Sequence, residues 1–119
     1  MNIGIVCAGA IAQFLLKKIN QEGTEEMKIN SIFVRNRKKY EHLEQQHNLK
    51  LYTELDAFLE SNVDIVVEAA NIEAVHALFP AILRKKDVII ISIGALADTS
   101  FFQKMNDLAH TYEIGRAHV

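Results

Sequence analysis

The first twelve residues constrain the fold more than any other part of the chain. An apolar, β-branched run at residues 3–6 is followed at once by small residues and then by a helix-like segment that starts near Ala10. Such a run suits a strand buried on both faces of a parallel sheet, and Gly9 lies where the strand passes into the helix. A corner of this kind offers free backbone N–H groups and the positive end of a helix dipole, which favour a phosphate group.

The corner matches a dinucleotide-binding fingerprint in part. The pattern G-x-G-x-x-G places Cys7, Gly9 and Ala12 at its three glycine positions. Gly9 allows close approach of a pyrophosphate, and Ala12 is small enough for helix packing at the third position. Cys7 is the larger departure, because this tight turn favours glycine and a side chain there is expected to weaken binding. We predict that Gly9, Ala10 and Ile11 bind the pyrophosphate, with a simple strand-to-helix connection as the alternative.

A β-α-β unit surrounds this fingerprint. Apolar residues at helical spacing predict a helix over residues 10–21, with Ile11 and Phe14 on its apolar stripe. Residues 28–34 then have the composition of a strand, which completes a unit of about 30 residues. This context favours a nucleotide site over a simple connection.

Strands and helices continue to alternate along the rest of the chain. The expected elements are helix 38–48, strand 49–52, a small helix capped by Thr53, strand 63–70, helix 72–84 capped by Asn71 and bent at Pro80, strand 87–95 and helix 98–110. The alternation predicts an α/β fold, a Rossmann-like doubly wound parallel sheet with about five strands.

The residues that follow the second strand indicate which cofactor binds. In such folds the chain there reaches the adenosine ribose, where a carboxylate binds the 2′-hydroxyl of NAD and arginine suits the 2′-phosphate of NADP. This chain has Arg35, Asn36 and Arg37 at that place and no carboxylate. We predict a preference for NADP, or at least tolerance of it, with NAD also allowed. The alternative is a solvated helix start that happens to be basic.

Two later strands end in small and polar residues, at the edge where open parallel sheets bind ligands. The fourth strand ends in Glu68, Ala69 and Ala70. The alanines leave room for a ribose or nicotinamide, and the carboxylate is either a polar anchor or a charge at a helix N-terminus. The fifth strand contains Ser92 and Gly94, which we expect to line the same crevice.

Length, charge and cysteine content limit the classes of function. A chain of 119 residues forms one domain at most, and its net charge of −2 does not indicate binding to nucleic acid or to an anionic membrane. No apolar run approaches the ~18 residues of a membrane span, and a single cysteine allows no internal disulfide, so a cytoplasmic location is expected. The sequence predicts no metal site and no catalytic residue.

Residues 4–11, 66–70 and 92–98 together resemble the NAD(P)-binding domain of the L-aspartate dehydrogenase family. The resemblance covers residues 1 to about 113. It implies reversible NAD(P)-dependent deamination of L-aspartate, through iminoaspartate to oxaloacetate, and a link to NAD biosynthesis. The nucleotide-binding domain of a homoserine dehydrogenase-like enzyme is one alternative, and a non-catalytic nucleotide-sensing module is another.

The resemblance also divides the chain. Residues 1–113 are expected to form the dinucleotide-binding domain, and residues 114–119 resemble the translation of a sequencing adapter and are expected to be an artefactual tail. Family members continue into a catalytic domain, so this chain is expected to be a truncated fragment that binds a nicotinamide dinucleotide and does not turn over the amino-acid substrate. An unpaired apolar sheet edge favours self-association, and hence a homo-oligomer.

Overall fold

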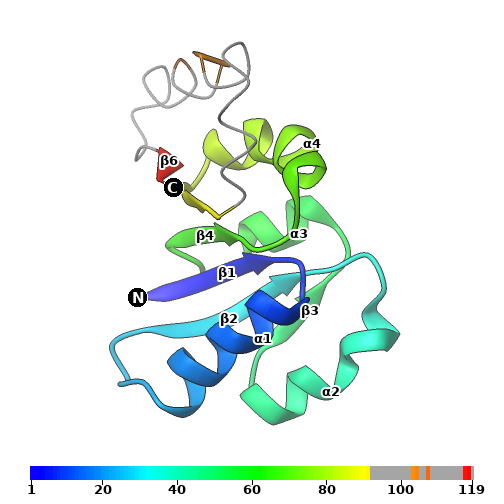
Figure 1. The fold of residues 1–119 in the computed structure, drawn as a ribbon, viewed down its shortest axis with the longest axis vertical. Helices are drawn as coiled ribbons and strands as arrows, with labels where there is room; N and C mark the ends of the chain where they lie inside the picture. The colour runs from blue at the N-terminus through cyan, green and yellow to red at the C-terminus, as the bar shows by residue number, and fades with distance from the viewer. Residues whose placement is uncertain (92–102, 105–106, 108–116, 119) are drawn as a thin grey trace.

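A computed structural model describes residues 1–91, 103–104, 107 and 117–118. Their strands form one parallel sheet in the order β3-β2-β1-β4-β5-β6 (Figure 1). The strands are β1 Asn2–Val6, β2 Lys28–Phe33, β3 Lys50–Tyr52, β4 Ile65–Glu68, β5 Asp87–Ile90 and β6 Ala117–His118. The order reverses beside β1, because β2 and β4 pair with its two edges. The predicted α/β, Rossmann-like doubly wound sheet is confirmed.

Helices cover both faces of this sheet. They are α1 Ala10–Leu16, which continues as the π-helix η1 Lys17–Gln21, then α2 Arg37–His47, α3 Leu55–Glu60 and α4 Ile72–Leu83. One core contains buried side chains of α1 and α2, and the other contains those of α3 and α4. The central strand β1 contributes to both cores, since Ile5 lies in the first and Val6 in the second. This burial on both faces explains its continuous apolar run.

Glycine at position 4 lets α3 approach β1 closely. A Cβ atom built on Gly4 would lie 2.8 Å from Cζ of Phe58 and 3.2 Å from Cγ1 of Val63. Phe58 is fully buried and contacts the rings of Phe33 and Tyr52, with centroids 5.9 and 6.1 Å away. The glycine therefore makes room for the aromatic centre of this core.

The buried side of α1 differs from the predicted stripe. Ile11 and Phe14 are 47% and 58% exposed, whereas Ala12 and Leu16 are fully buried. The prediction was wrong for Ile11 and Phe14. The short side chain of Ala12 allows the helix to lie close to the sheet, and this turns the pair at positions 12 and 16 inward.

Two predicted helix caps have opposite outcomes. The Oδ1 atom of Asn71 accepts a hydrogen bond from the N–H of Ala74 at 2.8 Å, so the predicted cap of α4 is confirmed. The predicted cap by Thr53 is wrong, because Glu54 is the N-cap residue of α3 and makes no side-chain cap bond. The helix begins one residue too late for the Thr53 hydroxyl to reach its first turn.

The sheet extends into the tail. Ala117 and His118 pair in parallel with Val88 and Ile89, so a two-residue sixth strand adds to the five expected strands among the described residues. Much of the expected helix 98–110 lies outside the described residues. Within it, Gln103, Lys104 and Asp107 are helical and exposed.

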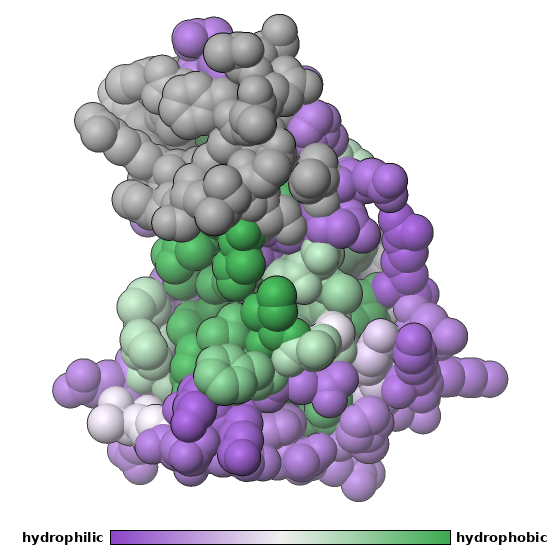
Figure 2. Space-filling model, viewed as in Figure 1, coloured by the Kyte–Doolittle hydropathy of each residue, from purple (hydrophilic) through white to green (hydrophobic). Residues whose placement is uncertain are grey.

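Apolar surface gathers on the sheet face that carries α1 (Figure 2). A groove of about 270 Å³ there is lined by Met1, Ile3, Ile5, Leu15, Ile19, Met27, Ile29, Ile65, Val67, Ile89 and Ile91. A contiguous apolar patch of this kind is typical of a contact surface. Within the described part of the chain, no helix is long and apolar enough to cross a membrane.

Candidate functional site

A cleft of about 380 Å³ opens at the carboxyl ends of β1, β2 and β4, where the strand order reverses. It is lined by Val6, Cys7, Ala8, Phe33, Val34, Arg35, Asn36, Lys39, Tyr40, Ala70, Asn71, Ala74 and Leu78. Three loops that are far apart in sequence therefore meet here. In open parallel sheets this is the place where ligands bind.

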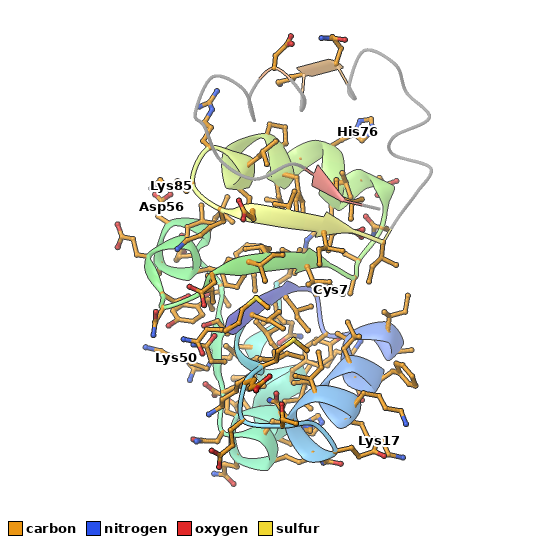
Figure 3. The ribbon with its side chains drawn as sticks, turned by 90° about the vertical axis from the view of Figure 1, so that its left-hand side faces the viewer. Cys7, Lys17, Lys50, Asp56, His76 and Lys85 are labelled. Carbon is orange, nitrogen blue, oxygen red and sulfur yellow. The ribbon has the colours of Figure 1, made fainter. Side chains whose placement is uncertain are left out.

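The loop after β1 contains a strained residue. Cys7 has a φ angle of 85°, in the left-handed region that side chains other than glycine rarely adopt. Its N–H donates to the carbonyl of Phe33 at 2.8 Å, which holds the end of β1 against the end of β2. Figure 3 shows Cys7 where β1 passes into α1. The turn at this position is thus one that favours glycine, as the fingerprint alignment predicts.

Glycine at position 9 has no structural necessity within the described chain. Gly9 has a φ angle of −75°, and a Cβ atom built on it would meet only Sγ of Cys7, at 3.9 Å. Gly9 is the N-cap residue of α1 and makes no side-chain cap bond, so the first N–H groups of α1 have no partner from a cap. Ala10 and Ile11 begin the helix and are exposed. None of these three predicted residues is in the described lining of the cleft, but Gly9 directly follows Ala8, which is.

The second wall of the cleft is basic. Arg35 and Lys39 line it together with Asn36 and Tyr40, and no residue of the described lining is acidic. Asn36 caps α2 by accepting a hydrogen bond from the N–H of Lys39 at 3.4 Å. The Lys39 ammonium lies 5.5 Å from the centroid of the Tyr40 ring. A cationic, partly aromatic wall suits a phosphate next to a flat ring.

Arg37 lies outside this wall. Its Nη2 atom is 3.0 Å from Oε1 of Glu44, and the N–H of Leu51 donates to Oε2 of Glu44 at 3.1 Å. The hydrogen bond from Leu51 is the main cause that lowers the pKa of Glu44 below 4.5, and Arg37 adds to it against the effect of burial. Arg35, Asn36 and Arg37 were predicted to bind the cofactor. The structure places Arg35 and Asn36 in the cleft lining, whereas Arg37 pairs with Glu44 outside it.

The third wall comes from the end of β4 and from α4. Ala70 and Asn71 line it with Ala74 and Leu78, whereas Ala69 is buried beneath it. Glu68 is 0% exposed and does not line the cleft. Ser92 and Gly94 lie outside the described residues.

Sequence reasoning missed Lys39 and Tyr40 as lining residues. A signal for Lys39 was available, because it belongs to the same basic run as Arg35 and lies in the first turn of the helix that follows. Leu78 and Ala74 of α4 also line the cleft. Among the described residues there is no group of three or more His, Cys, Asp or Glu side chains that could hold a metal ion.

Comparison with protein families gives a match over most of the chain. Residues 8–114 match the family described as homoserine dehydrogenase, NAD binding domain. The chain is 38% identical over 117 residues to the L-aspartate dehydrogenase of Methanocaldococcus jannaschii, and 36% identical over 110 residues to that of Methanothermobacter thermautotrophicus. The matches cover 98% and 92% of this chain but only 43% and 42% of those relatives.

Solved structures share the fold. Biliverdin reductase from Synechocystis, in complex with biliverdin and NADP⁺, has a TM-score of 0.78 and 17% identity, covering 99% of this chain and 37% of that one. Homoserine dehydrogenase from S. aureus has a TM-score of 0.74 and 22% identity, covering 99% of this chain and 31% of that one. At these identities the likeness concerns the fold alone.

Proposed function

We propose, from the premise that this chain belongs to the family of homoserine dehydrogenase NAD-binding domains, that its cleft binds NADP for an L-aspartate dehydrogenase. The observation that carries the proposal is the meeting of three loops in one cleft with a basic wall, where Gly9 and the uncapped start of α1 directly follow Ala8 of the lining. When bound, NADP⁺ would accept the hydride that L-aspartate loses on oxidation to iminoaspartate. The protein supplies binding and orientation.

The start of α1 is suited to the pyrophosphate. Gly9 has no internal contact that requires a missing Cβ, and its backbone is not left-handed. A phosphate that approaches the backbone closely gives a physical reason for glycine at this position. The N–H groups at the start of α1, which no side chain caps, are available to donate to the phosphate oxygens.

The basic wall is suited to the 2′-phosphate of the adenosine ribose. Arg35 is exposed after the end of β2 and lines the cleft, and Lys39 in the first turn of α2 adds a second cation. A guanidinium group binds phosphate oxygens with two parallel hydrogen bonds. The described lining has no acidic side chain, so it has no carboxylate to accept a hydrogen bond from the 2′-hydroxyl of NAD.

Replacement of Arg35 tests this assignment. We expect Arg35→Ala to weaken NADP binding about tenfold to a hundredfold, the worth of a charged hydrogen bond, and to leave NAD binding nearly unchanged. The measurement is isothermal titration of both cofactors. Arg37→Ala is the matched control, because Arg37 pairs with Glu44 outside the cleft. Equal losses for NADP and NAD in Arg35→Ala would contradict the role of Arg35.

We propose that the chain alone binds cofactor without turning over substrate. The chain spans 43% of the length of the Methanocaldococcus relative, and the groups that act on the amino acid are proposed to lie in the remainder of such a protein. Oxidation of L-aspartate by the purified 119-residue chain with NADP would contradict this. L-homoserine is the second candidate substrate, favoured by the description of the matching family, and an assay of a full-length protein with both amino acids separates the two.

A homo-oligomer is proposed for the same protein. The support is the apolar groove over β1, β4 and β5, whose described lining contains only apolar residues. Light scattering on the purified chain would measure its mass in solution. A monomer at all concentrations would contradict self-association.

A further inference from the structure

Glu68 is a buried carboxylate with two backbone partners from different loops. It is the last residue of β4 and is 0% exposed. Its Oε2 atom accepts a hydrogen bond from the N–H of Ala70 at 2.8 Å, and its Oε1 atom accepts one from the N–H of Ile91 at 3.0 Å. The N–H of Ile91 also donates to the backbone carbonyl of Glu68 at 3.4 Å. Ala70 begins the connection to α4, and Ile91 directly follows β5. One side chain therefore joins the exits of two neighbouring strands.

A buried carboxylate at position 68 lowers the stability of the fold unless its hydrogen bonds compensate for the loss of hydration. Burial of a charged or polar group is unfavourable, and the preceding residues of β4, Val66 and Val67, fill the two cores with apolar side chains. A valine at position 68 would leave the N–H of Ala70 without this acceptor. Glu68 thus makes less apolar packing than a valine would, but its carboxylate holds the backbone directly after β4 in place.

The path that it fixes is a wall of the cleft. The N–H of Ala69 donates to the carbonyl of Val6 at 3.3 Å, the N–H of Ala70 donates to Glu68, and Asn71 caps α4 through Ala74. Three successive residues are therefore held by three separate bonds. Ala70 and Asn71, the second and third of them, line the cleft opposite the basic wall.

We propose that Glu68 is a positioning residue for the dinucleotide: it does not touch the ligand, but it holds the Ala70–Asn71 wall in place before the ligand binds. The proposal rests on the proposed function of the cleft. A wall that is already ordered reduces the conformational entropy lost on binding. This also gives Glu68 a role other than the direct cofactor contact expected from the sequence.

The test is Glu68→Gln in the full 119-residue chain. The side chain keeps its shape, but one oxygen becomes an NH₂ group that cannot accept. Either the N–H of Ala70 loses this acceptor, or the N–H of Ile91 keeps only the backbone carbonyl of Glu68. We expect NADP binding to weaken about tenfold, measured by titration at a temperature where circular dichroism shows the variant fully folded. Val88→Ala is the control, because Val88 is fully buried in β5 and does not line the cleft. It should lower the melting temperature and leave the NADP dissociation constant unchanged.

Two outcomes would overturn the proposal. One is a Glu68→Gln chain that is less stable but binds NADP as well as the wild type does. The other needs no variant and applies even if Glu68→Gln does not fold. In the wild-type chain without NADP, the amide proton of Ala70, whose acceptor is the Glu68 carboxylate, should exchange slowly with solvent, and exchange at unprotected rates would show that the wall is not held in advance. A wild-type chain that binds neither NADP nor NAD would instead overturn the proposed function, with the exchange rates still testing the bridge.

Discussion

At the scale of single residues, glycine positions carry the clearest physical information. The fingerprint has three of them, and the structure distinguishes the two that lie in the loop. Position 7 has a left-handed backbone and holds cysteine, whereas position 9 has an ordinary backbone and holds glycine. Strain inside the folded chain therefore explains a preference for glycine at position 7. It does not explain glycine at position 9, which we attribute to close approach of the proposed ligand.

Cys7→Gly tests this distinction. A left-handed backbone costs a residue with a Cβ roughly 1–2 kcal/mol, and removal of the side chain relieves this strain. The flexibility of glycine in the unfolded chain offsets part of the gain in stability. We expect the free energy of unfolding to rise by about 0.5–1 kcal/mol in urea titrations, and NADP binding to tighten.

Cys7→Ala is the matched control, because it removes the thiol but keeps the strained Cβ. It should give no gain in stability. If both variants had the same stability, the φ angle of 85° would not be a source of strain.

At the scale of elements, the sequence predicted the type of most helices and strands better than the side that each one buries. The helix over residues 10–21 is present, although its second half has π-helical hydrogen bonding. Its apolar stripe gave the wrong buried side for Ile11 and Phe14. These side chains are large, whereas the close contact with the sheet is made through the small Ala12. Hydrophobicity at helical spacing gives the period of a helix, but the choice between two apolar sides depends on packing against other elements.

Glu44 joins α2 to β3, and its hydrogen bond predicts a pH dependence. Because the pKa of Glu44 is lowered in the folded state, its contribution to stability is complete above about pH 4.5 and is lost as the pH falls through the folded-state pKa. We expect Glu44→Gln to lower the free energy of unfolding by about 0.5–1 kcal/mol at pH 7, with the difference from wild type becoming smaller as the pH falls below about 4.5.

Urea unfolding between pH 7 and pH 3 measures this difference. Glu41→Gln on the exposed side of α2 is the control and should change stability little at any pH. A difference between Glu44→Gln and wild type that stays constant down to pH 3 would contradict the role of the ionised carboxylate.

At the scale of the whole molecule, alternation of strands and helices was sufficient to predict the layered sheet and the edge that holds the cleft. The convergence of Arg35 and Ala70 followed from a general rule, because the carboxyl ends of parallel strands meet at one edge. The two-residue strand β6 was not predictable, since so short a segment has no periodicity. The pairing of Arg37 and the burial of Glu68 depend on neighbours from other elements, which a single sequence does not specify.

The central claim is that the cleft between the ends of β1, β2 and β4 binds NADP. The most direct measurement is a titration of the ¹⁵N-labelled chain with NADP, followed through its backbone amide signals. The account predicts that the largest shifts occur at Cys7, Gly9, Arg35 and Ala70, and that NAD produces the same pattern at higher concentration. No shifts with either cofactor, or shifts confined to the apolar groove on the α1 face, would contradict it.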